Sequence, residues 1–431
     1  MKELNICIAG LGNVGSHLIL SIEENKEFIY SKSSLTFNIL GISAKNQKKK
    51  RTFNIKNYNW YDNPLDFLKI KKCNVIIELI GEEKGLSFEL VKKALENKIH
   101  VITANKALLA KNGLDLFKIA EKNKVLLLYE AAVAGGIPVI KTIKNNIFLN
   151  RFKKVSGILN GTTNYILTTM LEENLTFDEV LSIAKSKGFT SDAESELDIG
   201  GLDSAHKLTI LASICFGAQI NFSNNQVIGI TEISIIDIIN ANKLGYKIKL
   251  ISEAYIEDNK IYCLTEPKLI NKKNPLANVD GVLNAVKIET NHLESLFLEG
   301  EGAGGRVTAS SVISDLYEIC SRSDVPSLGY NTNNLIDYKK LSNLDIESTY
   351  YLRIMTKDIA GVLSKITGHF NDFGISIEKI LQLPDNNKKI SVSIIIFTHL
   401  IKKNKLLKVI KLIEKQDFIL EKIAIITIDK N

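Results

Sequence analysis

The stretch Leu4-Asn5-Ile6-Cys7-Ile8-Ala9-Gly10-Leu11-Gly12-Asn13-Val14-Gly15 joins a short apolar run to a glycine-rich turn near the start of the chain. The turn matches G-x-G-x-x-G, and Val14–Glu23 after it has the pattern of a helix. In that setting the first glycine permits a tight turn, the second lets the backbone approach a pyrophosphate, and the third lets helix and strand pack closely. The motif alone also fits a plain structural turn, but its setting predicts a dinucleotide site formed by Gly10, Leu11, Gly12, Asn13, Val14 and Gly15.

Strands and helices alternate beyond this turn. Branched apolar residues fill Asn74–Ile80, a composition typical of a strand buried on both faces of a parallel sheet. The alternation predicts an α/β, doubly wound Rossmann domain over residues 1–138. Its further strands are expected at Leu35–Ser43, His100–Thr103 and Val125–Tyr129, and its further helices at Phe88–Asn97 and Leu114–Asn123.

The character of the chain changes after Pro138. Residues 139–327 show helices and strands without strict alternation, which predicts an α+β domain. Residues 328–348 are rich in Asn, Ser and Asp and are expected to be a linker. In the α+β domain, helices are expected at Phe177–Lys187 and Asp203–Phe216, and strands at Lys260–Leu264, Ala285–Glu289 and Leu296–Leu298.

A second regular pattern begins at Thr349. Its order is βαββαβ, which predicts a complete ferredoxin-like module over residues 349–431. The expected elements are strand Tyr350–Met355, helix Gly361–Phe373, strands Ile375–Gln382 and Lys389–Phe397, helix Lys405–Lys415 and strand Phe418–Ile428.

Composition narrows the class of protein. The 431 residues include 55 Lys and Arg against 48 Asp and Glu, and this modest excess does not predict a nucleic-acid partner. The densest basic run, Lys48–Arg51, lacks aromatic interleaving and fits a solvated loop. Five scattered cysteines without a C-x-x-C pair predict reduced thiols and a cytoplasmic location. No apolar run of about 18 residues occurs, so no membrane partner is expected.

The end of the second strand bears on the choice of cofactor. An acidic residue there would accept the ribose 2′-hydroxyl of NAD, but the sequence reads Ser43-Ala44-Lys45-Asn46. Lys45 could pair with a 2′-phosphate, so NADP is favoured over NAD. The alternative is that Lys45 is only a surface lysine.

Two further segments carry candidate chemistry. Thr103-Ala104-Asn105-Lys106 follows a strand at the sheet edge where ligands bind, although Lys106 could also lie in solvent. Asp203 and Lys207 share a helix face four residues apart, a spacing that is also common for solvated ion pairs. The crowding of acidic groups around them favours a site for the ammonium of an amino acid. These groups are Asp192, Glu194, Glu196, Asp198 and Asp203.

The turn Asn160-Gly161-Thr162-Thr163-Asn164 enters another helix. Its backbone and hydroxyl donors, at Gly161 and Thr162, could hold a substrate. The simpler interpretation is a helix N-cap, which Asn and Thr favour.

Taken together, these residues resemble the homoserine dehydrogenase family along nearly the whole chain. The resemblance rests on six motifs in the family's order, at near-family spacing. They are Gly10–Gly15, Thr103–Lys106, Glu130–Pro138, Asn160–Asn164, Gly201–Lys207, and Gly302–Gly305 followed by Thr308–Ser311.

The resemblance implies reduction of aspartate 4-semialdehyde to homoserine with NAD(P)H. It implies that Lys207 and Lys106 handle the proton and orient the substrate. Asp203 would polarise the carbonyl oxygen directly or through water. A positive donor beside the developing alkoxide makes chemical sense of this arrangement.

The resemblance also implies a sodium ion under the Glu130–Pro138 turn. Glu130 and the carbonyls of Val133, Gly135 and Ile137 would supply hard oxygen ligands. The segment 300–327 would return to the nucleotide domain and bring Gly302 beside the cofactor. A homodimer is implied, with residues 139–327 serving catalysis and dimerisation, and paired C-terminal modules could make it a homotetramer.

The sequence departs from the family pattern in two places. Family members carry an amine-binding glutamate in a Gly-aromatic-x-Glu context, whereas Gly188-Phe189-Thr190-Ser191-Asp192 is one residue longer. Either Asp192 or Glu194 would take this role, with Asp198 nearby. Glu301 stands where proline is common, and Arg306 follows the glycines, which predicts altered detail rather than lost activity.

The C-terminal module resembles an ACT domain, with Asp358-Ile359-Ala360-Gly361-Val362-Leu363 as its first loop. Such domains pair between chains and bind an amino acid, so feedback by threonine or another end product is expected, with a purely oligomeric role as the alternative. Two other functions compete with the dehydrogenase assignment: a dehydrogenase of the same fold that acts on aspartate, and an amino-acid sensor without turnover. Neither alternative explains two lysines directed at one site.

Overall fold

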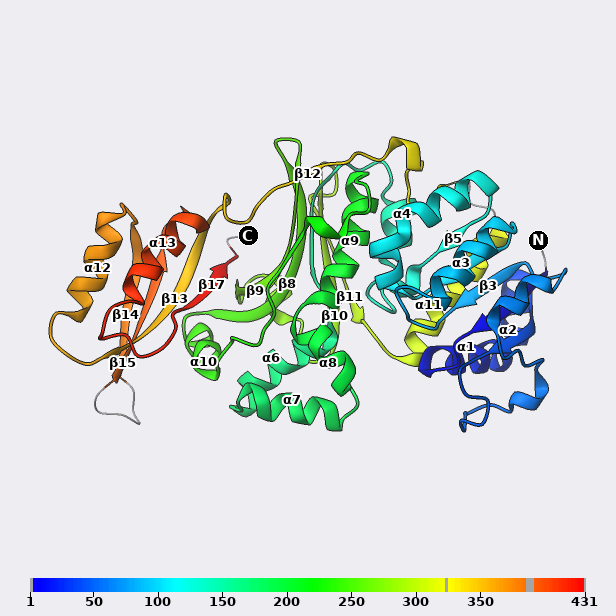
Figure 1. Ribbon diagram of the computed structural model, residues 1–431, viewed down its shortest axis with the longest axis horizontal. Helices are drawn as coiled ribbons and strands as arrows, with labels where there is room; N and C mark the ends of the chain where they lie inside the picture. The colour runs from blue at the N-terminus through cyan, green and yellow to red at the C-terminus, as the bar shows by residue number, and fades with distance from the viewer. Residues whose placement is uncertain (1–2, 322–324, 385–390, 430–431) are drawn as a thin grey trace.

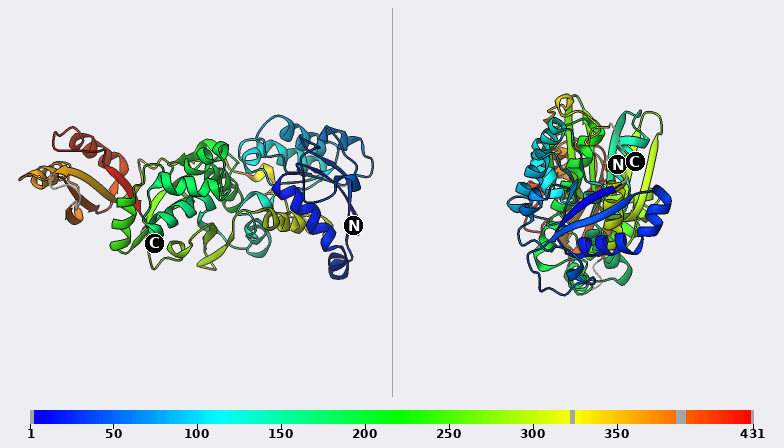
Figure 2. Two further views of the ribbon diagram at one scale, coloured as in Figure 1. Left: turned by 90° about the horizontal axis from the view of Figure 1, so that it is seen from below. Right: turned by 90° about the vertical axis from the view of Figure 1, so that its right-hand side faces the viewer.

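The computed structural model describes residues 3–321, 325–384 and 391–429. The chain forms three parts in a row, with the N-terminal α/β part at one end and the C-terminal module at the other (Figures 1 and 2). A long mixed sheet with its helices lies between them. None of the described helices is long and apolar enough to cross a membrane.

The N-terminal part contains the expected parallel sheet, so the Rossmann prediction is confirmed. Its strand order is β2-β1-β3-β4-β5, and the core on both faces is mainly aliphatic, with a few aromatic side chains. The strands are β1 (Glu3–Ala9), β2 (Thr36–Ser43), β3 (Val75–Glu78), β4 (His100–Thr103) and β5 (Leu127–Leu128). The main helices are α1 (Asn13–Glu24), α2 (Lys26–Ser33), α3 (Leu86–Glu96) and α4 (Lys106–Asn123).

Helix α4 begins at Lys106, earlier than the Leu114 expected from the sequence. Gly113 lies inside the helix. A Cβ on Gly113 would lie 3.0 Å from the Cδ1 atom of Ile220, so glycine here permits close packing rather than ending the helix. The Asn105 side chain accepts from the Leu108 N–H at 3.0 Å and caps the helix at its start.

Helix α11 (Gly305–Ser321) returns from the middle of the chain to the Rossmann part. It lies along α1 in Figure 1. Val312 and Leu316 of α11 share a buried cluster with Leu18 and Ile22 of α1. The Rossmann core therefore depends on a segment that is far away in sequence.

The middle part is an α+β structure. Its antiparallel strands run in the order β11-β10-β6-β8-β9, with helices packed against the sheet. The strands are β6 (Phe152–Ile158), β7 (Asn225–Val227), β8 (Tyr246–Glu257), β9 (Lys260–Asn271), β10 (Leu283–Thr290) and β11 (Ser295–Glu301). The helices are α6 (Gly161–Glu173), α7 (Phe177–Ser186), α8 (Asp192–Ile199), α9 (Leu202–Phe216) and α10 (Ile235–Lys243), after the short α5 (Val139–Lys141).

The C-terminal module has the expected βαββαβ order, and the ACT prediction is confirmed. The strand expected at Lys389–Phe397 begins at Ser391 in the structure, and Lys389 and Ile390 lie outside the described residues. The elements are β13 (Glu347–Lys357), α12 (Val362–Asp372), β14 (Ile377–Pro384), β15 (Ser391–Thr398), the short β16 (Ile401–Lys402), α13 (Lys403–Ile413) and β17 (Ala424–Ile428).

The module is joined to the middle part by more than a linker. Strand β17 pairs in parallel with β9, so that the two sheets form one continuous 12-stranded sheet. Arg353 of β13 also forms a buried ion pair with Asp237 of α10, with Nε 2.7 Å from Oδ1. The segment 328–348 is packed too, because Leu328 is fully buried and β12 (Lys339–Lys340) pairs with β9.

Candidate active site

The glycine turn after β1 has the geometry that the fingerprint requires. Gly10 has a φ of +103°, and a Cβ there would lie 2.3 Å from the Leu79 carbonyl oxygen. A Cβ on Gly15 would lie 2.0 Å from the Gly10 carbonyl oxygen. Gly12 is different, since no described atom lies within 4 Å of its ideal Cβ position. No described side chain caps α1, so its first N–H groups face this open space, which suits a pyrophosphate.

Lys45 is exposed just after β2. The basic run that follows is not simply solvated. The Arg51 guanidinium donates to the carbonyls of Asn46, Gln47 and Lys49 and lies 5.5 Å from the Trp60 ring. Arg51 therefore shapes the loop beside Lys45, a role that local sequence did not indicate because it depends on a tertiary fold.

Thr103 lies at the carboxyl end of β4, but its side chain faces the protein. Its hydroxyl donates to Glu78 Oε2 at 2.6 Å and accepts from the Asn105 N–H at 3.0 Å. Glu78 is fully buried and also accepts from the backbone N–H groups of Ile80 and Gly81. The Thr103 hydroxyl thus forms both of these hydrogen bonds within the protein, and they hold the turns around the cofactor position. Sequence reasoning missed Glu78, an acid inside an apolar strand.

The two predicted lysines meet at one carboxylate. Lys106 Nζ lies 3.1 Å from Asp203 Oδ1, and Lys207 Nζ lies 2.7 Å from Asp203 Oδ2. Lys207 also donates to the Leu159 carbonyl at 2.6 Å. Asp203 and Lys207 are each 8% exposed, while the Lys106 side chain is 41% exposed. Lys106 is therefore the solvent-accessible lysine of the cluster, and Lys207 is the buried one.

Charge holds this cluster in its ionised form. Burial alone would raise the pKa of Asp203, but the ammonium groups of Lys207 and Lys106 outweigh burial and hold it well below its usual range. The Asp203 carboxylate in turn raises the pKa of Lys106 against the effect of burial. An array of this kind can present a cation to an oxygen that gains negative charge.

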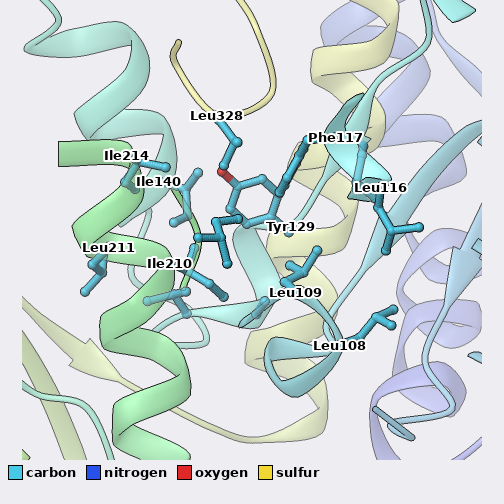
Figure 3. Close-up of a cluster of buried hydrophobic side chains, with 14 of the residues drawn as sticks. Leu108, Leu109, Leu116, Phe117, Tyr129, Ile140, Ile210, Leu211, Ile214 and Leu328 are labelled. Atoms are coloured by element: carbon cyan, nitrogen blue, oxygen red, sulfur yellow. The ribbon is translucent and has the colours of Figure 1, made fainter. Parts of the chain in front are cut away.

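Hydrophobic packing brings the two lysines together. Lys106 begins α4 and Lys207 lies in α9, and these helices pack side by side across the boundary between the first two parts. Figure 3 shows the contact. Its labelled side chains come from α4, α9 and the segments beside them: Leu108, Leu109, Leu116, Phe117, Tyr129, Ile140, Ile210, Leu211, Ile214 and Leu328.

Asn160 connects Asp203 to a second carboxylate. Its Nδ2 atom donates to Asp203 Oδ2 at 2.9 Å and to Asp198 Oδ1 at 2.7 Å. Its Oδ1 atom accepts from the Thr163 N–H at 2.8 Å and caps α6. Burial, followed by the charge of Asp203, raises the pKa of Asp198. The sequence singled out the motif around Asn160 but not this residue, because the cap explained it sufficiently.

The remaining substrate-site candidates fall into two groups. Gly161 follows Asn160, and a Cβ on it would lie 2.5 Å from the Val282 carbonyl oxygen; the Thr162 hydroxyl donates to the Phe189 carbonyl at 3.0 Å. Glu194 is exposed, and its carboxylate accepts from the Ser191 hydroxyl at 2.9 Å; its charge is one of several that raise the pKa of Lys106. Asp192 is not brought to the cluster: its side chain is 93% exposed and pairs with Lys185 at 2.8 Å.

His206 precedes Lys207 and was not among the predicted site residues. Its ring lies 4.6 Å from the Phe222 ring, and burial, together with the nearby Lys111 ammonium, lowers the pKa of His206 to about 4. Its Nε2 atom is buried without a hydrogen-bond partner in the described part of the chain. The imidazole is therefore neutral near pH 7 and does not add a third positive charge.

Most of the Glu130–Pro138 turn is buried, although Gly136 and Pro138 are exposed. The Glu130 carboxylate accepts from the backbone N–H groups of Ile140 and Lys141, and Ile137 and Val133 lie within the apolar core. Burial, then the charge of Asp315, raises the pKa of Glu130 to about 7. Within the described ranges, no group of three or more His, Cys, Asp or Glu side chains could hold a metal.

The same turn touches the returning segment. A Cβ on Gly135 would lie 2.4 Å from the Gly302 carbonyl oxygen, and one on Gly302 would overlap the Asn284 amide. The Gly135 carbonyl accepts from the Ser311 hydroxyl of α11 at 2.7 Å. A Cβ on Gly305 would collide with the side chains of His17 and Asn13, so this segment reaches the glycine turn.

Comparison with known proteins gives a consistent result. Residues 10–130 match the model of the homoserine dehydrogenase NAD-binding domain, residues 138–317 match the homoserine dehydrogenase model, and residues 350–418 match the ACT domain. The chain is 38% identical over 405 residues to a homoserine dehydrogenase of Pseudomonas aeruginosa, covering 93% of this chain and 92% of the relative. The chain belongs to the homoserine dehydrogenase family.

Other homoserine dehydrogenases support the assignment. The enzyme of Bacillus subtilis is 35% identical, covering 93% of this chain and 92% of the relative. The structure of the Thiobacillus denitrificans enzyme matches with a TM-score of 0.91 at 33% identity, covering 100% of this chain and 99% of that one. The chain is thus an oxidoreductase with homoserine dehydrogenase activity.

A further homoserine dehydrogenase structure bears on the cofactor. It is a hyperthermophilic archaeal mutant in complex with NADPH, with a TM-score of 0.60 at 28% identity, and covers 74% of this chain and 98% of that one. Together with the match to an NAD-binding domain, it supports a nicotinamide cofactor for this chain.

Proposed function

We propose that this chain reduces L-aspartate 4-semialdehyde to L-homoserine with NAD(P)H, in the biosynthesis of threonine, methionine and isoleucine. The observation that carries the proposal is the meeting of Lys106 and Lys207 on the single carboxylate of Asp203. This buried, charged cluster lies beyond the carboxyl end of β4, at the sheet edge where α/β folds bind ligands.

The cluster would act on the carbonyl oxygen of the substrate. Bound NAD(P)H supplies the hydride that reduces the carbonyl carbon. The more exposed Lys106 orients the substrate, Lys207 provides the proton that the oxygen gains, and Asp203 holds both ammonium groups toward it. Carbon gains the hydride and oxygen gains the proton, so the product is an alcohol.

The amino acid end of the substrate would be held beside this cluster. Asp198 and Glu194 supply carboxylates for its ammonium, and Gly161 and Thr162 line the α6 entrance. Both alternatives for the amine-binding role are exposed; Glu194 is favoured because its charge acts on Lys106, whereas Asp192 pairs with Lys185.

The cofactor would lie over the glycine turn, with Gly10 to Gly15 at the pyrophosphate and Gly302 beside it. Exposed Lys45 at the end of β2 would pair with a 2′-phosphate, which favours NADP. A sodium ion would rest on the carbonyls of Val133, Gly135 and Ile137 near Glu130. Their hard oxygens and the surplus of buried carboxylates fit a monovalent cation.

The ACT module supports feedback by an amino acid, and the family supports a homodimer or homotetramer. Both are part of the proposal.

The test is NADPH oxidation, followed by absorbance, with aspartate 4-semialdehyde. Wild type should turn over, and Lys207→Ala should lose roughly 10²–10⁴-fold in kcat. The exposed Lys118→Ala serves as the matched control and should keep wild-type rates. Equal rates in Lys207→Ala would remove this lysine from the mechanism. No wild-type turnover with NADPH or NADH would favour an amino-acid sensor or another substrate.

A further inference from the structure

Lys249 is a buried lysine that the proposed reaction does not yet use. It lies in β8, and its side chain is only 1% exposed. Its Nζ atom donates to the Val279 carbonyl at 2.6 Å and to Asn164 Oδ1 at 2.9 Å. It also forms an ion pair with Asp280, with Nζ 2.9 Å from Oδ1. Because taking an ammonium out of water costs stability, a buried lysine with several partners calls for an explanation.

Asn164 links Lys249 to the segment 279–283, which leads into β10. While its Oδ1 atom accepts from Lys249, its Nδ2 atom donates to the Val279 carbonyl at 3.0 Å and to the Leu283 carbonyl at 3.1 Å. An ammonium can only donate, so it fixes which end of the amide faces it. Lys249 thereby also fixes the end of the amide that holds the two carbonyls.

Thr168 and Gly161 add two contacts between α6 and the segment 279–283. The Thr168 hydroxyl accepts from the Gly281 N–H at 3.3 Å and lies 3.4 Å from the buried ammonium. A Cβ on Gly161 would lie 2.5 Å from the Val282 carbonyl oxygen, so the segment also covers the first residue of the helix. The start of α6 is therefore held against this segment, beside β8 and β10 (Figure 1).

The start of α6 is also where the proposed substrate site lies. Asn160 accepts from the Thr163 N–H through Oδ1 and from the Asn164 N–H through its carbonyl. The N–H groups of Gly161 and Thr162 have no acceptor among residues 3–321, 325–384 and 391–429. The first N–H groups of a helix favour a negative charge, and an amino-acid substrate carries a carboxylate.

We propose that Lys249 is a positioning residue for the substrate. It holds the start of α6 against the segment 279–283, so that the first N–H groups of the helix face the substrate carboxylate. The charged cluster at Asp203 then meets the carbonyl end of the same molecule. Lys249 would act through Asn164 rather than by touching the substrate. The inference rests on the proposed reaction and adds to it a residue that sets the affinity for the substrate.

A lysine can do this where an apolar residue could not. The Val279 carbonyl and Asn164 Oδ1 both need a donor, and one ammonium supplies both. Burial lowers the pKa of Lys249, and the Asp280 carboxylate opposes this effect without cancelling it. A methionine of similar length would leave the two oxygen atoms unpaired, and the Asn164 amide could then turn and release the segment.

The test is steady-state kinetics of the full chain with aspartate 4-semialdehyde and NADPH. In Lys249→Met we expect KM for the semialdehyde to rise at least roughly tenfold, while KM for NADPH changes less than roughly twofold and kcat falls less than roughly threefold. A fall in kcat with an unchanged KM for the semialdehyde would overturn the proposal. An equal rise in both KM values would also overturn it.

Lys268→Met is the matched control. Lys268 lies opposite Lys249 in the register of β8 and β9, its side chain is 6% exposed, and it pairs with Glu253 inside the sheet. We expect Tm to drop, because Glu253 loses a buried partner, while KM for the semialdehyde stays within roughly twofold of wild type. A rise as large as in Lys249→Met would show that KM follows stability, and would overturn the proposal.

Lys249→Gln serves if Lys249→Met does not fold. Its uncharged amide keeps two donor hydrogens, so it should fold and raise KM for the semialdehyde roughly threefold. An unchanged KM in this variant would then count against the proposal.

Turnover by wild type separates the two proposals. Absence of turnover with NADPH and with NADH would refute the proposed reaction and the role of Lys249 with it. Turnover by wild type with an unchanged KM in Lys249→Met would refute only the role of Lys249.

Discussion

Lys106 and Asp203 come from different parts of the chain, yet their side chains meet with Nζ 3.1 Å from Oδ1. The first stands at the start of α4 and the second in the first turn of α9. The contact depends on the packing of these helices, so the site exists only when the Rossmann part and the middle part are docked. In the described part of the chain, Asp203 forms ion pairs with both predicted lysines.

Replacing this carboxylate should therefore disable the cluster as a whole. Asp203→Asn keeps the shape but leaves the ammonium groups of Lys106 and Lys207 without a counter-charge. We expect kcat for NADPH oxidation to fall roughly 10²–10³-fold and Tm to drop, because two cations would lie close together without an anion. Asp192→Asn is the control; it alters an exposed carboxylate and should change kcat less than about twofold. Similar losses in both variants would contradict the assigned role.

Asn160 should prove to be a positioning residue. Asn160→Ala removes the α6 cap and the bonds to Asp198 and Asp203, so it should lower stability by about 1 kcal/mol and kcat at least roughly tenfold. Asn160→Ser restores a good cap but cannot donate an amide to two carboxylates. Chemical denaturation should show recovered stability in Asn160→Ser, while kcat stays low. If kcat recovers together with stability, Asn160 acts only as a cap.

Local patterns in the sequence predicted much of this arrangement. The glycine turn, the alternation of strands and helices, and the i,i+4 pair of Asp203 and Lys207 all involve neighbours in sequence. The pairing of β17 with β9 joins residues that are far apart, so the sequence suggested a separate module and a linker instead. Strand pairing at such separations is set by tertiary packing, which a local pattern does not contain.

The candidate site also combines features set by neighbours in sequence with features set by tertiary contacts. Asp198 and Asp192 looked equivalent in the acidic run, but only Asp198 faces Asn160. Glu78 and Gly113 depart for a different reason from the usual composition of a buried strand and of a helix. The Glu78 carboxylate accepts from Ile80, Ser87 and Thr103, which lie in three segments of the chain, and Gly113 makes room for Ile220. In both cases the residue is explained by contacts with segments that are distant in sequence.

Lys45 should determine the cofactor preference. If its ammonium pairs with the 2′-phosphate, Lys45→Ala should raise KM for NADPH roughly tenfold and leave KM for NADH unchanged. Steady-state kinetics with both cofactors measures this split, and Lys118→Ala again serves as the control. A loss of equal size with NADH would mean that Lys45 affects the turn rather than the phosphate.

Glu130 should make stability depend on pH and sodium. The pKa of Glu130 in the folded chain is about 7, above its ordinary value of 4.5. A carboxyl with a raised folded pKa contributes stability that is complete below about pH 4.5 and is lost as the pH rises through 7. The shift corresponds to about 3 kcal/mol. Glu130→Gln cannot ionise, so its stability relative to wild type should increase between pH 4.5 and pH 8.

Chemical denaturation at the two pH values measures this difference and removes any constant cost of the altered hydrogen bonds. Glu89→Gln, which alters an exposed carboxylate, should show no such trend. Sodium at the neighbouring carbonyls would favour the ionised form of Glu130. NaCl should therefore stabilise wild type more than tetramethylammonium chloride does at equal ionic strength, and more at pH 8 than at pH 5. An equal effect of the two salts at pH 8 would argue against sodium at this turn, whereas a parallel pH dependence of wild type and Glu130→Gln would show that Glu130 does not titrate near 7.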